Sequence, residues 1–186
     1  IEIEKPQIEG IEAPGDITYG KYVVEPLERG YGTTLGNALR RIMLSSLPGT
    51  AATSIKIAGV QHEFSTVPGV KEDVTEIVLN VKGLLTKLHG ESGKTVYIEA
   101  VGPCEVTAGD IKTSHNVEVL NPDHVVANLT KDVALNMRLT ISRGFGYQPA
   151  AARRRPDEET RAIGRLMLDA SFSPVRRVAY AVESAR

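Results

Sequence analysis

The chain has 186 residues, of which 41% are hydrophobic, so it can bury a core, and its net charge of −1 gives no general attraction to nucleic acids or anionic membranes. Its single cysteine, Cys104, excludes an internal disulfide framework and is typical of a reducing compartment. No apolar run approaches the roughly 20 residues of a membrane span and no signal peptide is evident, so we expect a cytoplasmic protein. Because the chain begins with Ile1 rather than Met, we also expect it to be a fragment or a trimmed chain.

The first segments predict an antiparallel hairpin. Apolar and acidic residues alternate over residues 1–12, which is the pattern of a strand with one wet face. Pro14-Gly15-Asp16 supplies turn residues, and residues 17–28 continue as a second strand. The hairpin therefore precedes the region with the clearest helical pattern.

Residues 25–49, EPLERGYGTTLGNALRRIMLSSLPG, predict the helix around which the chain is organised. Gly30 and Gly32 indicate a turn, Thr33 and Thr34 are candidate caps, and Pro48-Gly49 ends the helix. An apolar stripe follows at helical spacing and consists of Leu35, Ala38, Leu39 and Ile42, widened by Met43 and Leu47. The stripe is wide for so short a helix, which suggests packing on two sides, one of them against another subunit.

Two adjacent arginines lie in the middle of this predicted helix. Arg40 and Arg41 point about 100° apart, so at least one must leave the apolar stripe and face a partner or water. Two solvated arginines on a core helix are the alternative interpretation.

The rest of the chain predicts one more helix among many strands. A turn at residues 67–69 precedes an apolar stripe at helical spacing, formed by Val70, Val74, Ile77, Val81 and Leu84. Strand-like segments occupy residues 52–60, 95–101, 116–120, 124–129 and 133–142, residues 143–164 are loop-rich, and residues 175–186 alternate as a last strand. The pattern predicts an α+β fold with antiparallel sheets and two main helices.

Two glycine-rich segments resemble nucleotide-binding loops only in part. GYGTTLG carries Leu35 where a dinucleotide fingerprint needs its last glycine. GESGKT lacks the first glycine of a phosphate-binding loop, because Leu88 occupies that position, and a strand rather than a helix follows it. We interpret Gly90 and Gly93 as residues of a hairpin turn.

No pattern of catalytic or metal-binding residues emerges. The four histidines, His62, His89, His115 and His124, lack ligand spacing, and no Asp-x-Asp pair or nucleophile motif occurs. The basic run Arg153–Arg155 is followed at once by Asp157–Glu159, which favours a solvated loop. We therefore expect no catalytic residue, no metal and no cofactor on this chain.

Long segments of the chain resemble one family. EPLERGYGTTLGNALRRIMLSSLPG, GVQHEFSTVPGVKEDVTEIVLNVKGL, SRGFGYQPA and DASFSPVRRVAYAVESAR are similar to the N-terminal domain of the bacterial RNA polymerase alpha subunit. The resemblance implies a dimerisation domain formed by residues 1–48 and 174–186, with residues 49–173 inserted as a second domain. It also implies a homodimer that assembles the beta and beta-prime subunits of DNA-directed RNA polymerase, a nucleotidyltransferase whose active site lies on other chains.

The resemblance further implies three sets of contact residues. The beta-facing set is Arg41, His62, Glu63, Phe64, Gly69, Val70, Lys71, Glu72 and Asp73. The beta-prime set is Lys82, Arg176 and Arg177, and the dimer interface is Leu35, Ala38, Leu39, Ile42 and Met43. Direct contact with DNA or a membrane is not expected.

Two departures from the family pattern affect these expectations. Phe145 stands where the family more often has a charged residue between two glycines, which weakens assignments in that loop. The chain also ends at Arg186, before a further strand and a long helix of the family's first domain, so we expect this chain alone to dimerise poorly or to aggregate.

Two other classes of protein are alternatives. A stand-alone α+β interaction or ligand-binding protein would need a concave pocket with convergent polar groups. An independent hydrolase or transferase would need a nucleophile motif, and neither Gly-x-Ser-x-Gly nor a Cys/His signature occurs. Co-purification of beta and beta-prime separates both from the polymerase interpretation.

Overall fold

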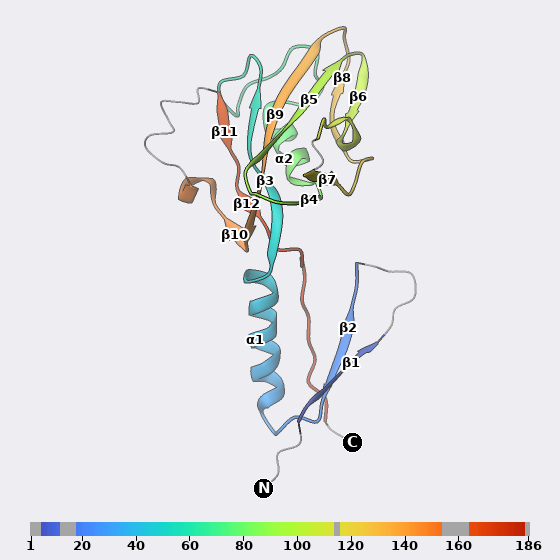
Figure 1. The fold of residues 1–186 in the computed structure, drawn as a ribbon, viewed down its shortest axis with the longest axis vertical. Helices are drawn as coiled ribbons and strands as arrows, with labels where there is room; N and C mark the ends of the chain where they lie inside the picture. Colours follow the sequence, from blue (N-terminus) through green and yellow to red (C-terminus); the bar gives the residue numbers. More distant parts are fainter. Residues whose placement is uncertain (1–4, 12–17, 114–115, 154–163, 185–186) are drawn as a thin grey trace. The chain divides into compact units, whose positions relative to one another are not determined.

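The fold was analysed in a computed structural model, which describes residues 5–11, 18–113, 116–153 and 164–184. It is an α+β structure with antiparallel strand pairing, which confirms the predicted fold class (Figure 1). The helices are α1 (Tyr31–Ser45), α2 (Val74–Lys82) and the short 3-10 turns η1 (Ala108–Asp110) and η2 (Ala150–Arg153). The strands are β1 (Gln7–Ile11), β2 (Lys21–Glu25), β3 (Pro48–Ile57), β4 (Thr86–Leu88), β5 (Lys94–Val101), β6 (Cys104–Thr107), β7 (Val117–Val119), β8 (Val125–Leu129), β9 (Ala134–Phe145), β10 (Tyr147–Gln148), β11 (Arg165–Met167) and β12 (Ala170–Ser171).

The largest sheet has four antiparallel strands in the order β11-β3-β9-β5. Strands β3 and β9 form its long centre, and their register shifts between Ala52 and Ser54, where β3 carries a bulge. Four two-stranded pairs complete the pairing among the described residues, namely β1-β2, β10-β12, β4-β7 and β6-β8. None of the helices among the described residues has the length and apolar character that a membrane crossing requires.

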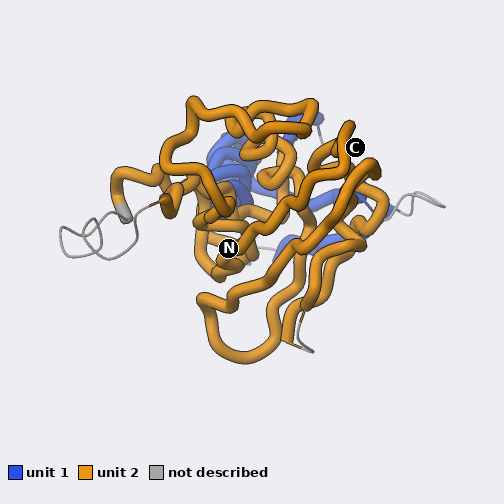
Figure 2. Tube along the Cα trace, turned by 90° about the horizontal axis from the view of Figure 1, so that it is seen from above, with its two compact units in different colours: residues 1–44, 177–186 blue, residues 45–176 orange. Residues whose placement is uncertain are grey.

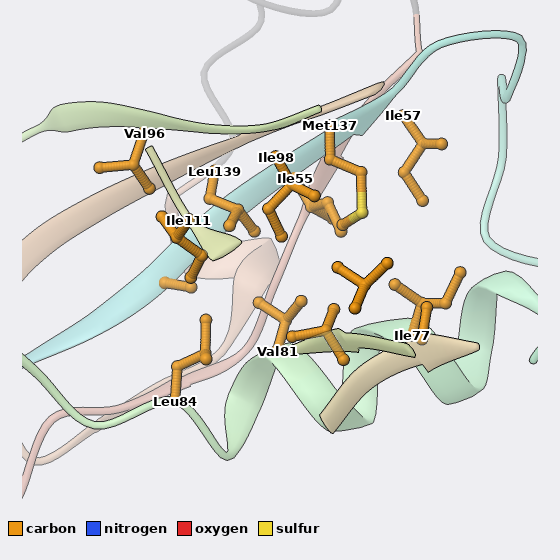
Figure 3. Close-up of a cluster of buried hydrophobic side chains, with 14 of the residues drawn as sticks. Ile55, Ile57, Ile77, Val81, Leu84, Val96, Ile98, Ile111, Met137 and Leu139 are labelled. Atoms are coloured by element: carbon orange, nitrogen blue, oxygen red, sulfur yellow. The ribbon is translucent and has the colours of Figure 1, made fainter. Parts of the chain in front are cut away.

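The hydrophobic core lies between one face of this sheet and helix α2. Side chains from β3, β5 and β9 point toward the helix, and Ile77 and Val81 of α2 point back toward them (Figure 3). Period-2 alternation in the strands and helical spacing in α2 therefore supply two matching apolar layers. The most deeply buried side chains include Ile55, Ile57, Ile77, Ile98, Leu135, Met137, Leu139 and Ile141.

Contacts divide the chain into two compact units, coloured separately in Figure 2. Unit 1 comprises residues 1–44 and 177–186, and unit 2 comprises residues 45–176. Unit 1 is therefore discontinuous in sequence, and unit 2 contains the four-stranded sheet and α2. In unit 1, β1 and β2 form the predicted antiparallel hairpin, with Gln7 opposite Glu25.

The first helix begins earlier than the predicted caps. It starts at Tyr31, so Thr33 and Thr34 lie inside its first turn, and the Thr34 hydroxyl donates to the carbonyl oxygen of Gly30. A hydroxyl in the first turn can satisfy a local carbonyl without ending the helix. The helix ends at Ser45, and Pro48 begins the next strand as the breaker signal predicted.

The second helix is shorter than its apolar stripe. Asp73 caps it by accepting a hydrogen bond from the backbone N–H of Glu76 at 2.8 Å, so the helix begins at Val74 rather than Val70. Val70 instead forms an isolated antiparallel bridge with Leu129. Val70 still fits the apolar stripe of the sequence because, although it lies before the helix, its side chain packs against the same core as the buried residues of α2.

Two turn and strand predictions also need correction. Gly90 and Gly93 both have positive φ, as expected of turn residues, but β4 and β5 on either side belong to different sheets and do not form a hairpin. The last segment, up to residue 184, is extended without a strand partner. Its alternation reflects packing beside α1 rather than pairing in a sheet, as described below.

Candidate functional site

The loop between β3 and α2 is held in one conformation by its own backbone. The Thr75 hydroxyl donates to the carbonyl of Glu63 at 3.0 Å, and the Val74 N–H donates to the carbonyl of Ser65 at 3.1 Å. The Ser65 N–H also donates to the His62 carbonyl at 3.3 Å, which closes a tight turn. These bonds tie the turn that carries Phe64 to the first residues of α2.

The second half of this loop pairs with strand β8 and the residue that follows it. The Lys71 N–H donates to the carbonyl of Asn128 at 2.9 Å, and the Thr130 N–H donates to the carbonyl of Gly69 at 2.8 Å. Gly69 has φ of +78°, a conformation that strongly favours glycine. The loop is therefore anchored at two places and presents a fixed surface.

Glu72 faces the interior of unit 2. It is 8% exposed, and its two carboxylate oxygens accept hydrogen bonds from the backbone N–H and the side-chain amide of Asn128, both at 2.7 Å. Charge-assisted hydrogen bonds of this kind are stronger than neutral ones and compensate for burial of the carboxylate. Glu72 thus positions the loop on β8, whereas the neighbouring Asp73 caps α2.

The loop exposes one aromatic ring and three polar side chains. Phe64 is 81% exposed, and His62, Glu63 and Lys71 are exposed as well. The His62 imidazole Nδ1 lies 3.2 Å from the Ser65 hydroxyl, which orients the ring. An exposed aromatic with a polar rim, on a backbone that is already ordered, is typical of a protein-binding surface.

Helix α1 exposes much of its predicted apolar stripe. None of its fifteen residues is buried. Leu39 is 41% exposed and Ile42 is 52% exposed, Ala38 is also exposed, and Leu35 and Met43 are partly buried. The residues expected at a dimer interface therefore lie together on one helix and keep apolar area available to a partner.

The C-terminal segment packs on a face of α1 that borders this apolar stripe. A Cβ added at Gly36 would lie 2.4 Å from the Tyr180 ring, and one added at Gly32 would lie 2.8 Å from Val182. The Tyr180 hydroxyl and the Asn37 side-chain oxygen form a hydrogen bond of 2.6 Å. Gly32 and Gly36 thus serve close packing on the helix, and Gly30, with φ of +89°, serves the turn before it, so the glycines of GYGTTLG are explained without a nucleotide.

The two arginines of α1 diverge as the helical geometry requires. The Arg40 Nε donates to the carbonyl of Val178 at 3.3 Å, so this side chain faces the C-terminal segment. Arg41 is exposed and points about 100° away around the helix. Arg41 belongs to unit 1, whereas the other residues of the predicted beta-facing set belong to unit 2.

The three cations of the predicted beta-prime set are all exposed. Lys82 lies in the last turn of α2, where a positive charge complements the helix dipole. Arg176 ends unit 2 and Arg177 begins the last segment of unit 1. The structure therefore leaves all three charges accessible.

A cavity of about 570 Å³ lies in unit 2 between η1 and β7. Its ionisable groups are His89 and Glu118, whose Nε2 and Oε2 atoms are 3.7 Å apart. Both side chains are more than half exposed, so the pair gains little from desolvation and gives this cavity no strong anchor for a ligand. Within the described residues, no group of three His, Cys, Asp or Glu side chains is arranged to hold a metal ion.

Sequence reasoning missed the residues that order the loop. Asn128 is 56 positions away from Glu72, and Thr75 lies on the helix that the loop precedes. No local pattern pairs residues so far apart, so only the structure reveals that the Glu72 carboxylate is buried and has an internal partner.

Comparison with known proteins places the chain in a family. A family model described as the RNA polymerase Rpb3/RpoA insert domain matches residues 55–173. The DNA-directed RNA polymerase subunit alpha of Alkaliphilus oremlandii (strain OhILAs) is 58% identical over 186 residues, which is 100% of this chain. The chain spans 58% of the length of that curated relative. It therefore belongs to the family of bacterial RNA polymerase alpha subunits that carry the Rpb3/RpoA insert domain.

Proposed function

We propose that this chain is a non-catalytic assembly subunit of bacterial DNA-directed RNA polymerase, which dimerises and scaffolds the beta and beta-prime subunits for transcription in the cytoplasm. The Alkaliphilus oremlandii relative is described as an alpha subunit of that enzyme, and the matching family model is described as the Rpb3/RpoA insert domain. The nucleotidyltransferase chemistry belongs to other chains, and this chain contributes surfaces rather than a cofactor or a metal.

The proposed domain layout assigns dimerisation to residues 1–48 with 174–186 and subunit contact to the inserted residues 49–173. Two compact units with nearby boundaries support it, since unit 1 combines both ends of the chain. An insertion between a helix and a C-terminal segment that packs on it leaves the first domain continuous in space.

The observation that carries the proposal is the exposed apolar stripe of α1. A 15-residue helix with no buried residue has a stripe that only another surface can cover. A second copy of this chain is the occupant we propose, because a two-fold axis lets the same stripe supply both sides of the interface. Leu35, Ala38, Leu39, Ile42 and Met43 would form it.

Sedimentation velocity of the chain at increasing concentration tests this interface. Ile42→Glu places a charge in the stripe and is expected to shift self-association at least about tenfold toward monomer. Thr33→Glu adds the same charge to an exposed position of the same helix and serves as the matched control. If the unsubstituted chain self-associates, even weakly or as aggregates, and both variants do so to the same extent, this interface is refuted.

For the beta subunit, we propose the ordered loop as the docking surface, with Phe64 as its apolar anchor. His62, Glu63 and Lys71 would form the polar rim, and Gly69 and Val70 would hold the backbone of the loop. Glu72 and Asp73 act through the loop as positioning residues, because their carboxylates bind within unit 2. Arg41 would add a guanidinium fork that reaches a carboxylate or carbonyl of beta.

Pull-down of purified beta by tagged chain tests the loop. Phe64→Ala is expected to weaken capture of beta by about tenfold or more, since aromatic anchors dominate such interfaces. Phe145→Ala removes another exposed phenylalanine, 58% exposed, and should leave capture unchanged. Arg41→Ala should weaken capture of beta and leave self-association intact. Undiminished capture by Phe64→Ala and Arg41→Ala together would reject the proposed surface.

The beta-prime contacts are proposed at Lys82, Arg176 and Arg177. Charge reversal at Lys82 should reduce recruitment of beta-prime to a preformed complex with beta while leaving capture of beta unchanged. Native electrophoresis of stepwise assembly separates these two stages, and loss of both stages together would contradict the assignment.

A further inference from the structure

Three cations and one tyrosine form a single row across the four-stranded sheet. Arg165 of β11 lies opposite Lys56 of β3, and Lys56 lies opposite Arg138 of β9. Arg138 lies opposite Tyr97 of β5, and all four residues are exposed. We call these four residues the cationic row.

The cationic row lies on the face of the sheet away from α2. Ile55 and Ile57, on either side of Lys56, are each 1% exposed and belong to the core between sheet and helix (Figure 3). Successive side chains in a strand point to opposite faces, so Lys56 and the residues opposite it share the outer face. The row is therefore a surface of unit 2 and contains no residue of the loop between β3 and α2.

The row lacks a negative charge of its own. Among the described residues, the ion pairs are His89–Glu118 and Lys112–Glu99, and neither involves a cation of the row. Arg165 donates from Nε to the Ser54 hydroxyl at 3.1 Å, and the Arg138 guanidinium lies 5.8 Å from the centroid of the Tyr97 ring. Both contacts orient guanidinium groups without neutralising them.

This arrangement costs stability within the chain. Like charges directly opposite each other on neighbouring strands repel, and the row contains two such pairs, Arg165–Lys56 and Lys56–Arg138. Surface charges that destabilise the fold are typical of sites retained for binding, where stability and function conflict.

We propose that the cationic row binds an acidic segment of a partner protein in an extended conformation. Neighbouring strands are about 4.8 Å apart, so the three cations span roughly 10 Å, a distance that two or three carboxylates of an extended segment match. Guanidinium forks bind carboxylates with paired hydrogen bonds. This inference does not rest on the proposed polymerase function, because it shares no residue with α1 or the β3–α2 loop.

The same residues fit a nucleic acid less well. The guanidinium of Arg138 already occupies one face of the Tyr97 ring, which removes a stacking platform for bases. Three cations also neutralise too few phosphates for firm binding at physiological salt.

Fluorescence anisotropy with a labelled oligoglutamate peptide tests the proposal on the 186-residue chain. Lys56→Glu should weaken peptide binding by about tenfold or more, because it reverses the central charge. Lys21→Glu makes the same change on β2, outside the sheet, and should leave the affinity unchanged. Binding by the unsubstituted chain should also weaken as salt is added.

A stability measurement makes the test specific. Lys56→Glu turns both like-charge pairs into opposite-charge pairs, so its thermal midpoint should rise by about 2–4 °C while peptide binding weakens. Arg138→Gln gives a second, neutral variant that should also weaken binding.

Three results would overturn the proposal. Equal affinity of the unsubstituted chain and Lys56→Glu for the peptide would remove the row as the binding surface. A thermal midpoint of Lys56→Glu below that of the unsubstituted chain would show that the like-charge pairs of the row do not destabilise the fold. Tighter binding of an oligothymidylate than of the peptide, with the same dependence on Lys56, would replace the acidic segment by a nucleic acid.

Discussion

The two units of this chain use their apolar residues in opposite ways. Every buried residue in the described part of the chain lies in unit 2, where α2 covers one face of the four-stranded sheet. Unit 1 has no buried residue among those described, although α1 is the longer of the two helices. An amphipathic pattern therefore specifies a helix, but it produces a core only where a second apolar layer is present.

The contrast is clearest between the two helices. Val74, Ile77 and Val81 of α2 are at most 1% exposed, whereas Leu39 and Ile42 of α1 are 41% and 52% exposed. Most helical stability in proteins comes from packing of the apolar face. Unit 2 thus contains the source of its own stability, whereas unit 1 leaves apolar surface exposed.

The largest expected effect concerns the core of unit 2. Ile77→Ala should lower the free energy of unfolding by about 2–5 kcal/mol, because it leaves a cavity at a position that is 0% exposed. Leu79→Ala on the same helix, at a position 61% exposed, should change it by less than about 0.5 kcal/mol. Guanidinium chloride unfolding measures both, and similar losses would contradict the placement of the core.

The next effect concerns the buried carboxylate of the loop. Glu72→Ala leaves the backbone N–H and the side-chain amide of Asn128 without their acceptor and should cost about 1–3 kcal/mol in urea unfolding. Glu63→Ala, at an exposed position of the same loop, is the control. If both variants unfold alike, Glu72 does not position the loop.

A smaller and local effect is expected in unit 1. Gly36→Ala places a Cβ against the Tyr180 ring and should speed hydrogen exchange of the amides in residues 178–182 while unit 2 stays unchanged. In a helix without that contact, replacing glycine by alanine would stabilise the helix by about 1 kcal/mol. Thr33→Ala is the control, and unchanged exchange in Gly36→Ala would show that the C-terminal segment does not need the glycine face.

The smallest effect is electrostatic. The hydrogen bond and charge of Lys112, 2.7 Å away, lower the pKa of Glu99 below its ordinary value of 4.5. A carboxylate whose pKa is lowered by folding stabilises the folded chain at pH values above its ordinary pKa. That contribution is lost as the pH falls through the lowered pKa of the folded chain. The pair is solvent-exposed, so its contribution should be slight.

An NMR titration of Glu99 measures this effect. Lys112→Met should return the pKa of Glu99 toward 4.5, whereas Lys87→Met, at an exposed lysine on β4, should not alter it. If the pKa of Glu99 is the same in Lys112→Met as in the unsubstituted chain, the ion pair is contradicted.

Several features of the fold were predictable because they depend on neighbours in sequence. Period-2 alternation located β5, β8 and β9, and helical spacing located α1 and α2. The start of α2 was misplaced because Val70 faces the same core through a bridge to Leu129. The C-terminal alternation was misread because an extended segment packed on a helix has the same period as a strand.

The sequence by itself determined the α+β class, the two helices, the turn glycines and the resemblance to a polymerase subunit, because those features follow from spacing and from long matching segments. Only the tertiary structure decided the strand order, the inward direction of Glu72, the close approach of Tyr180 to Gly36 and the alignment of Arg165, Lys56 and Arg138. Each of these depends on contacts between residues far apart in the chain, and such contacts arise only when sheet register and helix packing bring the residues together.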